Sequence, residues 1–90
     1  MKKINALVVD DSKEFTDEVK KYFKDDTEIN ILNVIFDGQE VLPYIEKHVN
    51  DIDVVLMDLI LPGKDGLAIL SALKNLKINK HVIVLSSYGK

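Results

Sequence analysis

The chain contains no cysteine, which excludes disulfide bonds and thiolate metal sites. It also has no apolar run long enough to cross a membrane, and the apolar stretch 4–9 is too short for a signal peptide. The net charge of -3 leaves no basic surface for nucleic-acid phosphates. We therefore expect a cytoplasmic protein whose residues bind neither membranes nor nucleic acid.

The length of 90 residues fits one small domain, and 47% hydrophobic residues is typical of an ordinary globular protein. No linker, internal repeat or low-complexity segment interrupts the sequence. We therefore expect residues 1–90 to form a single domain.

Strand patterns and helix patterns alternate along the chain, which favours an α/β fold with helices on the faces of a parallel sheet. Short runs rich in β-branched residues predict strands, and apolar residues three or four apart predict helices. The predicted strands cover residues 4–9, 28–36, 53–58 and 82–85, the second of them at an edge, and the helices cover about 12–24, 38–49 and 66–76.

The spacing of apolar residues predicts which faces of the helices are buried. The first helix presents an inward stripe of Phe15, Val19, Tyr22 and Phe23, and the third presents Leu67, Leu70 and Leu73. In the second helix, Pro43 lies beyond the first turn of the predicted range, so it predicts a late start or a kink.

Three aspartates follow predicted strands. Asp10 and Asp11 end the first strand, and Asp58 ends the third. The carboxyl ends of parallel strands meet at one edge of an open α/β sheet, where such folds bind ligands. Three neighbouring carboxylates stay ionised together only if a cation offsets their charge, and a hard divalent metal suits oxygen ligands. An aspartate beside such a metal can accept a phosphoryl group.

Three motifs in this order give the chain a resemblance to a known family. They are the acidic pair in Val8–Ser12, the Asp, Pro and Asp-Gly residues in Met57–Gly66, and the hydroxyl residue in Leu85–Ser87. Together they resemble the receiver domain of two-component response regulators, over the whole chain. The resemblance implies a flavodoxin/CheY-like doubly wound parallel sheet with strand order 2-1-3-4.

The resemblance also implies roles for individual residues. Asp58 is the expected phosphoacceptor, and Ser86 is the expected switch hydroxyl that turns toward the phosphoryl group. Mg²⁺ is the expected cofactor, bound by Asp11, by Asp10 through water, by Asp58 and by the backbone carbonyl of Ile60. The phosphoryl donor is a histidine kinase or a phosphotransfer protein. The domain is then not an enzyme in the usual sense, because it consumes its own phosphoryl group.

Other interpretations of these residues remain open. The run 11–14 has the form of a capping box, so Asp11 or Ser12 also fits the role of a helix cap. The whole domain also fits a non-phosphorylated interaction and dimerisation module. A metal-dependent phosphatase with an aspartyl nucleophile is disfavoured. Such an enzyme needs a second aspartate two residues after the nucleophile to act as an acid, and position 60 is Ile60.

The chain departs from the family after its fourth strand, at Lys90. Family members continue with a helix, a fifth strand that carries a lysine, and a last helix. We therefore expect a receiver that lacks its last helix-strand-helix and has an exposed fourth strand. A longer parent chain, a fragment and a homodimer that completes itself by edge pairing are the explanations left open.

A narrower resemblance rests on three further segments. They are residues 37–40, 66–70 and 86–90, and they are similar to the receiver half of the sporulation master regulator (stage-zero sporulation protein A) family. This resemblance implies a role in the sporulation of a spore-forming Gram-positive bacterium.

Overall fold

The structure is a computed structural model, and it describes residues 3–58, 65–78 and 80–85. Within these ranges the chain forms one sheet of four parallel strands in the order β2-β1-β3-β4, as expected from the sequence. The strands are β1 (Ile4–Val9), β2 (Ile29–Ile35), β3 (Val54–Asp58) and β4 (His81–Leu85). The helices are α1 (Lys13–Tyr22), α2 (Val41–Lys47), preceded by the 3-10 turn η1 (Gly38–Glu40), and α3 (Gly66–Asn75).

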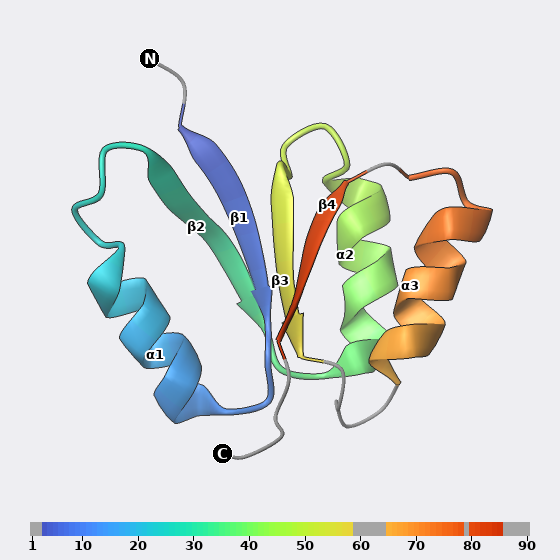
Figure 1. The fold of residues 1–90 in the computed structure, drawn as a ribbon, viewed down its shortest axis with the longest axis horizontal. Helices are drawn as coiled ribbons and strands as arrows, with labels where there is room; N and C mark the ends of the chain where they lie inside the picture. The colour runs from blue at the N-terminus through green and yellow to red at the C-terminus, as the bar shows by residue number, and fades with distance from the viewer. Residues whose placement is uncertain (1–2, 59–64, 79, 86–90) are drawn as a thin grey trace.

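The helices cover the sheet unequally. In Figure 1, α2 and α3 lie together on one face and α1 lies on the other. Alternate residues of a strand point to opposite faces of a sheet, so one set of strand residues faces α2 and α3. The main core lies between that set and the two helices. It combines strand residues such as Leu7, Val55 and Met57 with Ile45 of α2 and Ile69 of α3, all fully buried.

The opposite face has a smaller core. Ala6 and Val8 of β1 are buried there, and Thr16 is the buried residue of α1. The predicted inward stripe of α1 is wrong in part, since the side chain of Tyr22 is 80% exposed. The ring of Tyr22 instead contacts the edge of the Phe23 ring, with centroids 4.9 Å apart. Phe15, Val19 and Phe23 of the predicted stripe are half-buried, so Tyr22 is the member of the stripe that lies outside the inward face.

The third helix also differs from its predicted orientation. Leu73 is buried and Leu70 packs against the core, as expected, but Leu67 is 61% exposed. Ile69 is buried in its place. Residues 66, 69, 70 and 73 follow the i, i+3, i+4, i+7 spacing of one helix face, and Leu67 falls outside that face despite its apolar side chain.

Side chains at the first turns fix where the helices begin. The carboxylate of Asp65 accepts a hydrogen bond from the N–H of Leu67 at 3.0 Å, and Asp37 accepts one from Gln39 at 2.8 Å. The second helix begins late, at Val41, which agrees with the position of Pro43. Pro43 then lies in the first turn of α2, where an N–H has no partner within the helix.

The sheet has two edge strands among the described residues, β2 and β4. The ladder between β1 and β2 shifts its register between Ala6 and Leu7, an irregularity that disfavours further pairing along β2. Strand β4 exposes Ile83 and Val84, at 53% and 41%. No helix in the described part of the chain has the length and apolar character of a membrane span.

Candidate functional site

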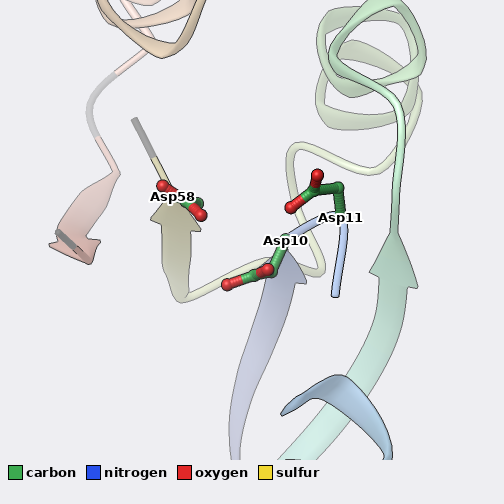
Figure 2. A group of neighbouring side chains, drawn as sticks. All are labelled: Asp10, Asp11 and Asp58. Atoms are coloured by element: carbon green, nitrogen blue, oxygen red, sulfur yellow. The ribbon is translucent and has the colours of Figure 1, made fainter. Parts of the chain in front are cut away.

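The three aspartates singled out from the sequence meet at one end of the sheet. Val9 of β1 lies beside Met57 of β3 in the parallel ladder, so the residues that follow, Asp10 and Asp58, lie at the same level. Figure 2 shows the carboxylates of Asp10, Asp11 and Asp58 gathered beyond the carboxyl ends of β1 and β3. The expected convergence of these three residues is therefore present in the structure.

The carboxylates are close enough to share one cation. One oxygen from each of the three residues lies within 4.8 Å of the others. Asp10 is fully buried and Asp58 is 2% exposed, whereas Asp11 is exposed to solvent. The cluster therefore has two buried carboxylates and one on its solvent-exposed side.

The loop after β1 holds Asp10 in place from both its backbone and its side chain. The N–H of Asp10 donates to the carbonyl of Ile35 at 3.1 Å, which extends the pairing between β1 and β2 by one residue. The Oδ1 atom of Asp10 accepts a hydrogen bond from the N–H of Ser12 at 2.9 Å. This hydrogen bond fixes the direction of the Asp10 carboxylate relative to the loop.

The structure identifies Ser12 as the cap of α1. Its hydroxyl oxygen accepts a hydrogen bond from the N–H of Phe15 at 3.2 Å, and its backbone is extended as expected for a residue before a helix. Asp11 therefore does not serve as the cap, and its exposed carboxylate lies in the aspartate cluster instead. The sequence left open whether Asp11 or Ser12 caps the helix. In the structure Ser12 is the cap, and Asp11 is a member of the aspartate cluster.

The donor set suits a hard divalent cation. Three carboxylates supply only oxygen ligands, and Mg²⁺ prefers oxygen at short distance while it keeps several waters. Negative charges this close repel one another, most strongly between the buried residues Asp10 and Asp58, where water screens them least. A divalent ion bound among them offsets that repulsion.

Two predicted site residues lie outside the described residues. They are Ile60, whose backbone carbonyl is an expected metal ligand, and Ser86, the expected switch hydroxyl. The roles of both remain predictions. The hydrogen bond that orients Asp10 was not predicted from the sequence, because its donor is a backbone N–H that any residue at position 12 except proline would supply.

The fold is shared with known receiver structures. The chain is 26% identical to the signal receiver domain of the response regulator NarL from Mycobacterium tuberculosis, with a TM-score of 0.86 over 100% of this chain and 71% of that one. It is 32% identical to a chain of the CheX-CheY-BeF3-Mg complex from Borrelia burgdorferi, with a TM-score of 0.83 over 97% of this chain and 64% of that one.

A third similar structure is the RcsB response regulator from Salmonella typhimurium. It is 22% identical, with a TM-score of 0.81 over 96% of this chain and 44% of that one, so it shows the fold alone. The chain thus spans from less than half to about seven tenths of these three proteins. Its sequence matches the response regulator receiver domain over residues 6–90, a range that includes all three aspartates. The chain belongs to the response regulator receiver domain family.

Proposed function

We propose that this receiver domain accepts a phosphoryl group on Asp58, with Mg²⁺ as the cofactor. The observation that carries the proposal is the meeting of Asp10, Asp11 and Asp58 within 4.8 Å at the carboxyl ends of β1 and β3. The family is that of receivers in two-component signalling. The donor is then the phosphohistidine of a histidine kinase or of a phosphotransfer protein.

In the transfer, one bond to phosphorus replaces another. A carboxylate oxygen of Asp58 attacks the phosphorus atom, and an acyl phosphate bond forms. The bond from phosphorus to the imidazole nitrogen breaks, and that nitrogen keeps the electron pair. The burial of Asp58 fixes the direction of its carboxylate, and positioning of this kind supplies much of the rate in phosphoryl transfer.

Asp10 and Asp11 would hold the metal beside Asp58. Asp10 is oriented by the N–H of Ser12, while Asp11 is exposed and so accessible to an incoming hydrated ion. When bound, Mg²⁺ offsets negative charge on the oxygens of the phosphoryl group. The backbone carbonyl of Ile60 is the proposed further ligand.

The product would act as a conformational signal. Phosphorylation adds about 1.5 to 2 negative charges at Asp58, and Ser86 is the proposed hydroxyl that turns to donate to the new oxygens. The domain would change the activity of an output domain or partner and would not turn over a substrate. We therefore propose a signalling role and not an enzymatic one.

A second candidate function is dimerisation through the receiver fold without phosphorylation. The exposed apolar residues Ile83 and Val84 on β4 favour it, since an exposed edge strand is a template for pairing with another chain. The buried aspartate pair favours phosphorylation, because a module used for dimerisation alone has no need of Asp10 and Asp58 at one site.

The setting of the protein is also part of the proposal. We place it in the cytoplasm, where histidine kinases present their phosphohistidine, and we assign no nucleic-acid binding to these acidic residues. A role in sporulation, from the narrower resemblance of residues 37–40, 66–70 and 86–90, stays a prediction.

Binding of beryllofluoride with Mg²⁺ tests whether the site is competent. For one similar structure, the isolated RcsB receiver of Salmonella enterica, BeF3- is a phosphomimetic. In two-dimensional NMR spectra of the chain already in Mg²⁺, we expect added beryllofluoride to shift the amide signals of residues 10, 11 and 58. An Asp58→Asn variant should lose this response and stay folded. A folded parent chain with no response, or with a response that survives Asp58→Asn, would contradict the proposal.

A further inference from the structure

A groove runs between strand β2 and helix α2, at the edge of the sheet opposite to β4. Its volume is about 500 Å³, and none of the three site aspartates lines it. The apolar part of its wall includes Val34, Ile35 and Phe36 from the β2 side and Pro43 and Tyr44 from α2. Phe36 is 41% exposed, so the groove presents an aromatic side chain to solvent.

The residues of η1 and α2 that line this groove carry opposite charges at the two ends of the lining. Glu40, Pro43, Tyr44 and Lys47 are spaced by three, one and three residues, so they form one stripe along the helix. The stripe carries a negative charge at its start, a positive charge at its end, and the rings of Pro43 and Tyr44 at its centre. Among the described residues, neither Glu40 nor Lys47 forms an ion pair within the chain.

The aromatic centre of the stripe is already ordered. Tyr44 packs against the main core, and its ring lies on that of His48 with centroids 4.3 Å apart. A side chain held in this way loses little conformational freedom when a partner covers it. Large aromatic residues fixed at the centre of a patch are the usual anchors of protein interfaces.

We propose that this stripe, which runs from Glu40 at the end of η1 to Lys47 of α2, binds the same stripe of a second copy of the chain. With the two α2 helices antiparallel about a two-fold axis, Tyr44 of each copy lies near the centre. Glu40 then faces Lys47 of the partner subunit, and Lys47 faces Glu40 of the partner subunit. A two-fold contact requires a patch complementary to itself, and opposite charges at equal distances from an apolar centre meet that requirement.

The contact is small. The stripe covers seven residue steps, which is about 10 Å along a helix, and Phe36 extends it to one side. An interface of this size is at the low end for specific association, so the dimer forms at high concentration only. This contact requires neither β4 nor phosphorylation of Asp58, so its failure and the failure of the proposed function are distinguishable.

Charge reversal tests the proposal with sedimentation velocity over roughly 10 µM to 1 mM chain. Each single variant, Glu40→Lys or Lys47→Glu, places like charges in both contacts of a homodimer, so dissociation constants should rise at least about tenfold. The double variant should restore association. An equimolar mixture of the two single variants should also associate, because every contact between unlike copies then pairs opposite charges.

Two controls locate the contact. Glu46→Lys changes an exposed charge on the same helix outside the groove and should leave association unchanged. Ile83→Lys places a charge on the edge strand β4 and should also leave it unchanged. Circular dichroism melting confirms that each variant is folded. A parent chain that stays monomeric at 1 mM would overturn the proposal, and so would a dimer that Ile83→Lys abolishes while the charge reversals leave it intact.

Discussion

The Oδ1 atom of Asp10 accepts a hydrogen bond from the backbone N–H of Ser12 at 2.9 Å. This contact lets one short loop carry two separate functions. The carboxylate of Asp10 is oriented for the site by a backbone group, while the hydroxyl of Ser12 remains available to cap α1. Stability of the helix and chemistry of the site therefore depend on different atoms of neighbouring residues, and substitutions can separate them.

The first prediction concerns the helix cap. Ser12→Ala removes the hydroxyl that accepts from the N–H of Phe15 but keeps the N–H that donates to Asp10. We expect the free energy of unfolding, measured by urea denaturation, to fall by about 1 kcal/mol. Mg²⁺ affinity should stay unchanged, because the orientation of Asp10 is preserved. Loss of Mg²⁺ binding without loss of stability would show that Ser12 serves the site and not the helix.

The second prediction concerns the exposed carboxylate of the cluster. Asp11→Asn removes one of three negative charges, so calorimetric titration should show weaker Mg²⁺ binding. Without metal, the same variant should be at least as stable as the parent chain, because repulsion among the carboxylates falls. Asp25→Asn, at an exposed residue beyond α1, is the matched control and should change neither quantity. A strongly destabilised Asp11→Asn variant would instead assign Asp11 a structural role.

The third prediction compares two leucines of α3. Leu73→Ala should lower the free energy of unfolding by about 2 to 4 kcal/mol, because it leaves a cavity in the main core. Leu67→Ala should change it by less than about 0.5 kcal/mol, since Leu67 is 61% exposed. Urea denaturation of both variants measures the difference. Equal costs would mean that α3 is rotated from the orientation described above.

The fourth prediction concerns pH. Hydrogen bonds from the N–H groups of Glu28 and Ile29, at 2.7 and 2.8 Å, hold the pKa of Asp26 below its ordinary value. Because the folded pKa lies below the unfolded one, this stability is fully present above the unfolded pKa. It is lost as pH falls through the folded pKa. Carboxyl NMR titration should give the low pKa directly, and Asp26→Asn should weaken the acid dependence of unfolding. A normal titration of Asp26 would contradict this prediction.

The order of elements and the convergence of the acids could be predicted from the sequence. Buried parallel strands have short, nearly continuous apolar runs, such as residues 6–9 and 54–57, so β1 and β3 can be predicted. The residue after each run can then be placed at one edge of the sheet. Pro43 predicts the late start of α2 by local chemistry alone. Strand runs and helix starts depend on residues that are close together in the sequence, so they can be predicted from one sequence.

The orientation of exposed apolar residues could not be predicted in the same way. Tyr22 and Leu67 fit an apolar spacing, yet both are exposed, because burial depends on which elements reach that side of the helix. Periodicity indicates that a helix has an inward face but does not fix its limits. The groove between β2 and α2 depends on the packing of Tyr44 against the core and had no signal in the sequence.

Phosphorylation of Asp58 is the central claim, and intact-mass measurement after incubation with acetyl phosphate tests it most directly. The parent chain with Mg²⁺ should gain the mass of one phosphoryl group. Omission of Mg²⁺ or the Asp58→Asn substitution should remove this gain, while an Asp25→Asn control keeps it. A folded parent chain that gains no mass, or a gain that persists in Asp58→Asn, would contradict the account.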